Sequence, residues 1–305
     1  MQHRHRNLPA ALAMVAAMTS FCLNDAFMKA LSATVPIGEL MAVRGVFAVT
    51  LLALLLPRLG QRLGRPDRYA VLRGIGELVV GFAFLTALRF LPLGDTYTLY
   101  FAAPIMLTAV AALVFGERVG PHRWAAVLVG FLGVLVVLGL PSQWQAASLL
   151  ALLAAALSVV RDIFTRKVSP DVGSGTVALV TGAVVMLGGV ATAVTGNWVP
   201  LGWREVAWCA LAALGAAGGY VGFVAGLRMG ELSFVATFRY SAIPVAMVIG
   251  LVVWGDVPSL QMLAGAALIM ASGLYILLRE RRRMLARRAA GERSPASSPA
   301  ARSRT

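Results

Sequence analysis

Reactive and metal-binding side chains are scarce in this chain of 305 residues. It holds two cysteines, Cys22 and Cys209, and three histidines, His3, His5 and His122. Both cysteines fall within long apolar segments, where cysteine behaves as a small hydrophobic side chain, and two cysteines build no disulfide framework. No metal-ligand spacing, phosphate-binding glycine loop or nucleophile elbow is present. We therefore expect no metal, no cofactor and no catalytic residues, and an enzyme is disfavoured.

Charged residues are also few, at 13% of the sequence, whereas 59% of the residues are hydrophobic and the mean hydropathy is +0.80. This composition is typical of an integral membrane protein. A helix of about 20 apolar residues spans a hydrocarbon core. We therefore predict an all-α integral membrane fold with ten transmembrane helices, at residues 9–31, 37–57, 69–90, 93–115, 121–140, 146–166, 173–195, 203–227, 232–254 and 258–278.

The second half of the chain repeats the first half. Three short motifs recur in the same order and at a nearly constant offset. They are Asp25-x-Phe27-x-Lys29 with Asp162-x-Phe164-x-Arg166, Phe84-x-x-Ala87-Leu88-Arg89 with Phe223-x-x-Gly226-Leu227-Arg228, and Tyr100-x-x-x-Pro104 with Tyr240-x-x-x-Pro244. Each half holds five apolar segments, and because five is odd the second half must enter the membrane in the opposite orientation. Inverted repeats of this kind are typical of transporters. The predicted units are an N-terminus at 1–8, repeat one at 9–140, repeat two at 146–278 and a tail at 279–305.

Basic residues lie mostly on one side of the predicted membrane spans. The loops on the other side hold only Arg89 and Arg204. Because cytoplasmic loops carry the excess of lysine and arginine, both termini are predicted to be cytoplasmic. The same distribution accounts for the net charge of +14 without nucleic-acid binding. The tail at 279–305 is basic and poor in large apolar residues, so we expect it to be disordered and to anchor the topology or to lie on anionic lipid.

The order of these features resembles that of a known family. Each half ends its fourth span with a small acidic turn, and each fourth span carries a proline. These features are Gly116-Glu117-Arg118-Val119 and Gly255-Asp256-Val257-Pro258, with Pro104 and Pro244. With ten spans in two halves, the chain resembles the drug/metabolite transporter superfamily and its EamA-type branch. The resemblance implies a secondary carrier of small organic metabolites in the bacterial inner membrane that works by alternating access. It also implies a central cavity between the first four spans of each half, peripheral fifth spans, and a homodimer formed through the fifth and tenth spans.

A narrower resemblance rests on a few residues within the spans. Asn24-Asp25-Ala26 with Lys29, Arg44, and Phe238-Arg239-Tyr240 are similar to a subgroup that includes carriers of riboflavin and S-adenosylmethionine. Relatives with comparable features move amino acids or metal-chelating metabolites. The resemblance therefore ranks substrates and does not name one.

Ionisable residues within the spans are the strongest candidates for the substrate site. A charge at the bilayer centre costs at least about 2.5–3.5 kcal/mol, so each needs a reason to be there. The candidates are those that differ from their counterpart in the other repeat, since an asymmetric ligand calls for asymmetric contacts: Glu77, Arg239, Arg44, and Arg161 with its counterpart Asn24. The alternative is that Arg239 or Arg44 pairs with Glu77 or Asp25 and locks helices together.

Tyr100 and Tyr240 each precede a proline by four residues and so lie on the same helix face as that proline. Proline removes a backbone donor and bends the helix. We predict that each bend acts as a hinge and presents a tyrosine to the substrate, for stacking and hydrogen bonding. The alternative is a packing tyrosine beside a kink.

Glycines mark a second candidate hinge. Gly218, Gly222 and Gly226 share one face of the eighth span, and small residues let helices approach closely in lipid. We expect the third and eighth spans to pack tightly or to slide against each other there.

Glu77 leaves proton coupling open. A carboxylate within a span has a raised proton affinity and can carry a proton, whereas Arg73, one turn earlier, would hold the same carboxylate ionised as a fixed charge.

The function that these features favour is transport of a small organic metabolite. The candidate charges within the spans are three arginines and one glutamate, and this excess of positive charge favours an anionic or zwitterionic compound. The two candidate tyrosines favour a compound with a planar or aromatic part. An amino acid, a flavin or a compound like S-adenosylmethionine fits. The alternatives are a proton-coupled exporter of amino acids or toxic metabolites and, more remotely, a channel, a scramblase or a membrane enzyme.

Overall fold

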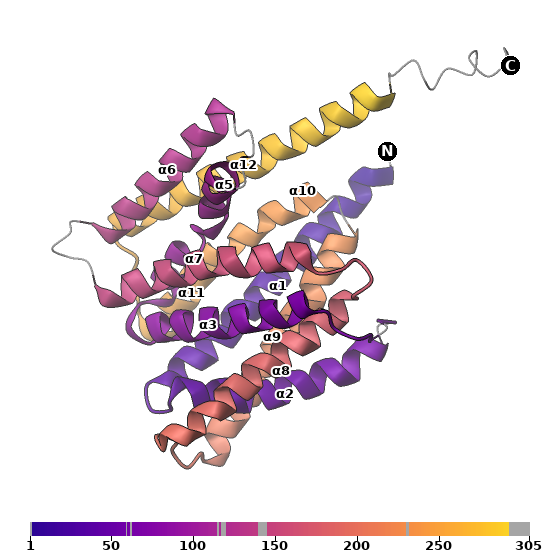
Figure 1. Ribbon diagram of the computed structural model, residues 1–305. Helices are drawn as coiled ribbons and strands as arrows, with labels where there is room; N and C mark the ends of the chain where they lie inside the picture. The colour runs from indigo at the N-terminus through magenta and orange to yellow at the C-terminus, as the bar shows by residue number, and fades with distance from the viewer. Residues whose placement is uncertain are drawn as a thin grey trace, which may run out of the picture.

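The computed structural model describes residues 2–58, 60–61, 63–114, 116, 120–139, 145–229 and 232–292. Within these residues the fold is all-helical, and ten helical spans are long and apolar enough to cross a membrane. The predicted fold class is confirmed, and each span lies close to its predicted position. The helices form one bundle, and both chain termini lie at the same end of it, which we call the terminus side (Figure 1).

The two halves contain the same succession of spans. The first half is made of α1 (Gln2–Ser32), α2 (Ile37–Arg58), α3 (Arg68–Phe90), α4 (Leu93–Tyr100) with α5 (Ala103–Leu113), and α6 (Pro121–Leu138). The second half is made of α7 (Ala146–Lys167), α8 (Ser174–Ala191) with η2 (Thr192–Thr195), α9 (Trp203–Met229), α10 (Leu232–Val235) with η3 (Ala236–Ser241) and α11 (Ala242–Trp254), and α12 (Leu260–Glu292).

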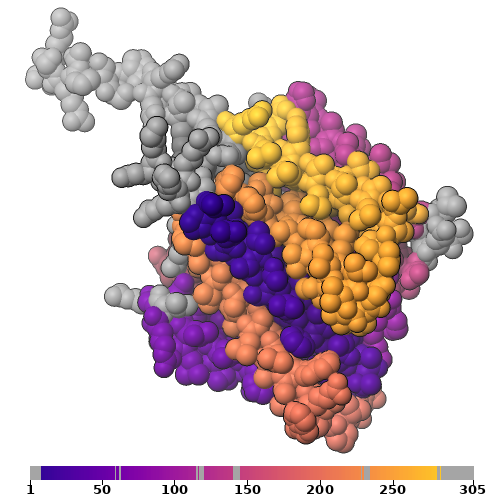
Figure 2. Space-filling model, turned by 180° about the vertical axis from the view of Figure 1, so that it is seen from behind, coloured from indigo at the N-terminus to yellow at the C-terminus, as the bar shows by residue number. Residues whose placement is uncertain are grey.

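Helix packing follows the repeat. The first helix of each half packs on the third helix of the other half, so α1 packs on α9 and α7 packs on α3. Equivalent helices also meet one another, as α2 with α8, α4 with α11, and α6 with α12. Figure 2 shows α1, in indigo, crossing the surface beside the orange helices of the second half. This exchange of partners is the pattern expected of two inverted repeats related by a pseudo-twofold axis.

The glycine face of α9 packs against α1 and not against α3. A Cβ added at Gly222 would lie 3.2 Å from the Ala17 Cβ, and one added at Gly215 would lie 2.8 Å from the Ser20 carbonyl oxygen. At Gly218 the nearest atom would be the Ser20 Oγ, at an ordinary 3.8 Å. The expected contact between the third and eighth spans is therefore wrong, because spacing along one helix shows which face is small and does not show which helix fills it.

The fourth span of each half is interrupted just before its proline. In the first half α4 ends at Tyr100 and α5 begins at Ala103, and in the second half the 3₁₀ segment η3 separates α10 from α11. Pro104 and Pro244 lack the N–H that would bond to the carbonyl four residues earlier, which belongs to Tyr100 or Tyr240. The tyrosine is therefore the last residue of α4 in the first half and lies within the 3₁₀ segment η3 in the second half.

The last helix, α12, is longer than the predicted tenth span. It continues to Glu292, beyond the predicted end of the tenth span at residue 278, and the arginines, alanines and leucine of residues 279–292 favour helix. The disorder expected of the basic tail stays a prediction. Residues 293–305 lie outside the described part of the chain. So do Glu117, Arg118 and Val119 of the first acidic turn. Gly116 and Gly255 both adopt a left-handed φ, of 64° and 71°, which glycine permits at a helix end.

A carboxylate joins the two halves at the terminus side, outside the membrane-spanning segments. The Asp67 side chain accepts hydrogen bonds from the backbone N–H groups of Ala70, at 2.7 Å, and Ser169, at 2.8 Å. It thereby caps the first turn of α3 and holds the connection between α7 and α8. These bonds stabilise the ionised carboxylate and lower the pKa of Asp67 below its ordinary value.

Candidate functional site

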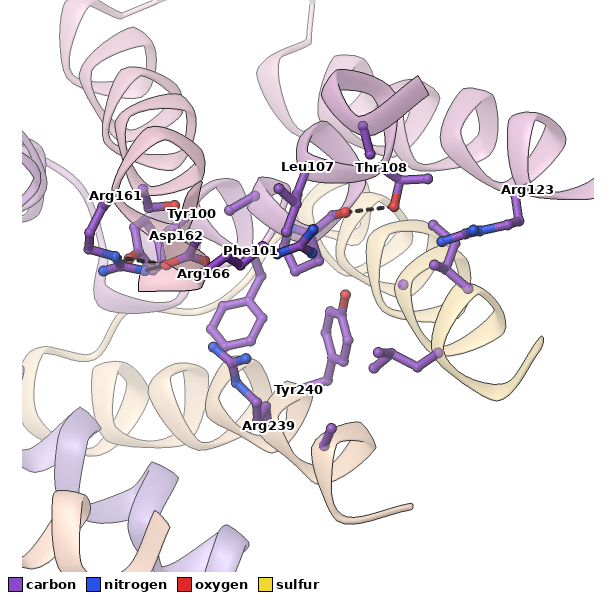
Figure 3. Close-up of a pocket in the computed structure, with 18 residues that line it drawn as sticks. Tyr100, Phe101, Leu107, Thr108, Arg123, Arg161, Asp162, Arg166, Arg239 and Tyr240 are labelled. Carbon is purple, nitrogen blue, oxygen red and sulfur yellow. Dashed lines mark hydrogen bonds and ion pairs between the residues drawn. The ribbon is translucent and has the colours of Figure 1, made fainter. Parts of the chain in front are cut away.

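A cavity of about 310 Å³ lies between the two interrupted spans and three neighbouring helices. Its walls come from α4 and α5, from α6 and α7, and from η3 and α12 (Figure 3). The lining runs from the two helix interruptions to Arg123, near the start of α6, and Arg166, near the end of α7. Both of these helix ends lie on the terminus side, so the cavity extends from the middle of the bundle toward that side.

Each helix interruption places aromatic side chains on the cavity wall. Tyr100 and Phe101 come from the first interruption, and Tyr240 comes from the second. The rings of Phe101 and Tyr240 lie 5.3 Å apart between centroids, with an angle of 55° between their planes. Aromatic rings attract one another at this separation, and together they offer an apolar wall against which a planar ligand can pack.

The hydroxyl group of Tyr240 is buried and unsatisfied. The residue is only 4% exposed, and its Oη has no hydrogen-bond partner among the described residues. The hydroxyl rests against Gly273 of α12, where an added Cβ would collide with it. A buried hydroxyl without a partner is unfavourable by about 1–3 kcal/mol, so an acceptor on a bound ligand would gain by meeting it.

Positive charge dominates the cavity lining. Four arginines line it, Arg123, Arg161, Arg166 and Arg239, against the single carboxylate of Asp162. Neither Arg166 nor Arg239 forms an ion pair within the described part of the chain. The electrostatics therefore favour a ligand that carries a negative group.

Arg161 is held by carboxylates on both sides. Its Nε and Nη2 donate to the Asp162 Oδ1 at 2.9 and 2.8 Å, and its Nη1 donates to the Glu77 Oε2 at 2.9 Å. The same Nη1 lies 3.4 Å from the Tyr100 hydroxyl, which accepts from it. The Arg161 side chain is 14% exposed and that of Glu77 is 33% exposed. These bonds fix the guanidinium at the cavity wall, with its charge balanced by the protein itself.

Arg239 is placed differently. It comes from η3, and its guanidinium carbon lies 5.5 Å from the centre of the Phe223 ring. It donates no hydrogen bond to any described residue. A cation over an aromatic face is favourable and leaves the guanidinium N–H groups available. Arg239 is therefore the lining residue best suited to hold a carboxylate or phosphate in a bidentate manner.

A second polar cluster lies apart from the cavity lining, within the first half. The Asn24 side chain accepts a hydrogen bond from Arg44 Nη1 at 3.1 Å and donates to the Asp25 Oδ1 at 2.7 Å. The Tyr97 hydroxyl donates to the other oxygen of Asp25 at 2.6 Å. Arg44 Nε is buried and has no hydrogen-bond partner among the described residues. This cluster joins α1, α2 and α4 through polar contacts.

The predicted site residues thus fall into three groups. The first group lines the cavity and consists of Tyr100, Pro104, Arg161, Arg239 and Tyr240. Glu77 is connected to this group through its ion pair with Arg161. Asn24 and Arg44 belong to the second cluster, and Pro244, Gly218 and Gly222 lie outside the lining. Glu77 forms an ion pair with another span charge, as the alternative of charge pairing predicts. Its partner is Arg161, however, and not Arg239 or Arg44. Arg73 donates instead to the Thr181 hydroxyl, at 2.5 Å.

Three charged lining residues were not among the predicted substrate ligands. Arg123 and Arg166 lie near span ends, and Asp162 has the counterpart Asp25 in the other repeat, so the search for span charges that differ between the repeats did not select them. The cavity also takes Arg123 from α6 and Gly273 from α12, although the family resemblance implied peripheral fifth and tenth spans. The repeat match between Lys29 and Arg166 was the one signal in the sequence that could have drawn attention to Arg166.

Metal binding finds no support in the described residues. No group of three or more histidine, cysteine, aspartate or glutamate side chains among them is arranged to hold a metal ion.

Ten apolar spans in two inverted halves, with a charged cavity between them, define a multi-pass membrane transporter. The model of the EamA-like transporter family matches residues 8–139. The riboflavin transporter of Rhizobium johnstonii is 30% identical over 209 residues, which cover 66% of this chain and 67% of that protein. The chain belongs to the EamA-like transporter family of the drug/metabolite transporter superfamily, whose members are transporters and not enzymes.

Other relatives are transporters of different small metabolites. The pseudopaline exporter of Pseudomonas aeruginosa is 27% identical over 267 residues, covering 86% of this chain and 93% of the exporter. The S-adenosylmethionine uptake transporter of Rickettsia prowazekii is 22% identical over 217 residues, covering 70% and 73%. A crystal structure at 21% identity, covering 88% of this chain and 98% of its own, superposes with a TM-score of 0.60 and has the same fold.

Proposed function

We propose that this protein carries a small anionic or zwitterionic metabolite with a planar or aromatic part across the bacterial inner membrane by alternating access. An amino acid, a flavin or a compound like S-adenosylmethionine fits this description. The observation that carries the proposal is the cavity, in which the arginines outnumber the carboxylate and two aromatic rings from opposite halves form one wall. The relatives named for riboflavin and S-adenosylmethionine support it.

The cavity offers separate places for the two parts of such a substrate. The free N–H groups of Arg239 suit a carboxylate or phosphate, because a guanidinium matches the geometry of either group. The planar part would pack on Phe101 and Tyr240, with the unsatisfied Tyr240 hydroxyl donating to a ring carbonyl or nitrogen. Arg161 would position Tyr100 and keep Glu77 away from the substrate's negative group.

The arrangement corresponds to an inward-open state. The excess of basic residues near the terminus side supports a cytoplasmic location for that side and for both termini. The opposite side is closed where α4 meets α11: Leu93 is fully buried, and a Cβ added at Gly94 would lie 2.7 Å from the Met247 Cγ. The interruptions at Pro104 and Pro244 and the close packing of Gly222 on α1 are the places where one half would bend or slide relative to the other.

The test is counterflow into liposomes that contain the purified protein. The probes are riboflavin, S-adenosylmethionine and aromatic amino acids. The liposomes are preloaded with one unlabelled probe, and the uptake of the same labelled probe from outside is measured. We expect saturable exchange of at least one probe, strongly reduced by Arg239→Gln. Arg58→Gln is the matched control, because Arg58 is also an exposed arginine but lies outside the cavity lining and bonds only to its own helix, at the Leu54 carbonyl. Equal rates for the two variants would remove Arg239 from the site.

The substrate and the direction of transport follow from a second measurement. Metabolites in cytosol and medium are compared between cells that lack the protein, cells that carry it and cells that carry Arg239→Gln. A compound that moves between the two pools only with the intact protein is the substrate. No such compound under several growth conditions, with the protein folded in the membrane, would count against a metabolite carrier.

Export of amino acids or toxic metabolites is the second candidate. The specific observation in its favour is similarity to the pseudopaline exporter over 86% of the chain. Net accumulation in the medium, increased by an imposed proton gradient, would support proton-coupled export. The dimer through α6 and α12, and proton coupling itself, stay predictions.

A further inference from the structure

Lys29 ties three helices together at the side opposite to the termini. It lies near the end of α1, and its Nζ donates to the carbonyl oxygens of Leu88, at 2.9 Å, and Leu91, at 2.5 Å, at the end of α3. The same Nζ lies 5.5 Å from the centre of the Trp254 ring, at the end of α11. The last carbonyls of a helix lack partners within the helix, and a lysine is a favourable donor to them.

The surroundings of Lys29 are the closed side of the transport path. Leu93, two residues after the Leu91 carbonyl, is fully buried, and Gly94 packs against Met247 of α11. The carboxylates of Asp95 and Asp256 also act on the lysine charge from α4 and from the turn after α11. Lys29 is thus bonded where both halves of the chain meet to close the path.

The repeat counterpart of Lys29 is in the opposite situation. Arg166 occupies the same position in the repeated motif, near the end of α7, on the terminus side. It lines the cavity, is exposed, and donates no hydrogen bond within the described part of the chain. One basic residue is therefore bonded at the closed end of the path, and its equivalent is free at the open end.

We propose that Lys29 is a residue of the transport path that closes its outer end in this state, and that it lines the outer mouth once the path opens outward. Inverted repeats exchange their conformations during alternating access, so Lys29 would then take the exposed position that Arg166 has here, and Arg166 would take the bonded one. At either mouth the free basic residue attracts the negative group of the substrate. This inference rests on the proposed inward-open, alternating-access function.

The proposal predicts that loss of the Lys29 hydrogen bonds shifts the population toward the outward-open state. The reporter is Leu93→Cys, in a background in which Cys22 and Cys209, both fully buried, are replaced by alanine. A membrane-impermeant maleimide is added to right-side-out vesicles and the rate of labelling is measured. We expect Lys29→Met to label at least five-fold faster than the parent reporter. Lys29→Arg, which keeps a donor for the carbonyls, should stay close to the parent rate.

Arg204→Met is the matched control. Arg204 is basic, lies on the same side at the start of α9, and sits over a tryptophan ring, with 5.0 Å between its Cζ and the Trp208 centroid. It donates no hydrogen bond to a described residue, so its loss should leave the labelling rate of the reporter unchanged. Elution as a single peak in detergent shows that each variant is folded.

Labelling and counterflow separate the two hypotheses. If the parent protein exchanges a probe in liposomes but Lys29→Met labels no faster than Arg204→Met, the role of Lys29 is refuted and the carrier function stands. If no probe exchanges, the proposed function fails, whatever the labelling shows. Should Lys29→Met not fold, the comparison moves to Lys29→Ala, which also removes the donor to the Leu88 and Leu91 carbonyls, and equal labelling of that folded variant and the parent refutes the proposal.

Discussion

Gly273 of α12 determines where the Tyr240 ring can lie. An added Cβ at this position would collide with the Tyr240 hydroxyl and would also approach the Cε1 to 3.1 Å. The collision involves a ring that is 4% exposed and whose centroid lies 5.3 Å from that of the Phe101 ring. Gly273→Ala is therefore expected to push the ring out of its present place, toward the cavity, without touching any charged residue of the site.

The size of the effect can be worked out from the contacts that move. Loss of one packing contact between the planar part of the substrate and the displaced Tyr240 ring is worth about 0.5–1.5 kcal/mol. Loss of one substrate hydrogen bond to the hydroxyl is worth about 0.5–1.5 kcal/mol. Together they amount to about 1–3 kcal/mol of binding, or roughly a 5- to 140-fold weaker apparent affinity for a planar substrate.

The assay is the concentration dependence of counterflow for the probe that the parent protein exchanges. Gly273→Ala should raise the half-saturating concentration, whereas in a Tyr240→Ala background the same change should have little further effect, because the ring is already gone. Gly218→Ala is the control glycine, since its added Cβ would meet only the Ser20 Oγ at 3.8 Å. Independent, additive losses from Gly273→Ala and Tyr240→Ala would refute the reasoning.

Three further predictions concern stability and coupling. Gly215→Ala should be less stable than Gly218→Ala by about 1–3 kcal/mol in denaturant unfolding. Both variants gain helix propensity, but only the alanine at position 215 is forced against the α1 backbone. Equal stabilities of the two variants would contradict this packing. Because the pKa of Asp67 is lowered in the folded protein, its carboxylate contributes stability that is fully present above the pKa of the unfolded chain, about 3.9, and is lost as the pH falls through the folded pKa. The melting temperatures of the parent and Asp67→Asn should therefore converge in acid. A difference in melting temperature that is constant with pH would contradict this role of Asp67. Glu77→Gln should leave the response of transport to a pH gradient unchanged, because Glu77 is held as the partner of Arg161, and a lost response would make it the proton carrier.

The spans and their repeat could be predicted from sequence because the signals are local. Each apolar run of about 20 residues identifies itself without reference to the rest of the chain. The breaks at Pro104 and Pro244 follow in the same way, from the missing proline N–H. The helical extension of α12 beyond residue 278 could not be predicted from hydropathy, because the residues there are charged and poor in large apolar side chains although several of them favour helix.

The contacts between spans could not be predicted in this way. The glycines of α9 show a small face, but only the assembled bundle shows that Ala17 of α1 fills it. Likewise, Glu77 and Arg161 are each recognisable as charges within spans, whereas their pairing depends on α3 lying against α7. The role of Arg123 in the cavity depends on how α6 packs on α12, which no local pattern encodes.

The exchange of helix partners between the halves has a consequence for how the chain is made. The face of α1 that receives Gly215 and Gly222 has no partner within the first half, because α9 supplies it. During synthesis, α1 must therefore wait in the bilayer, in contact with lipid or an insertion factor, until the eighth span has been delivered. A first half expressed alone would keep this face uncovered, and only co-expression with the second half would be expected to give a stable protein.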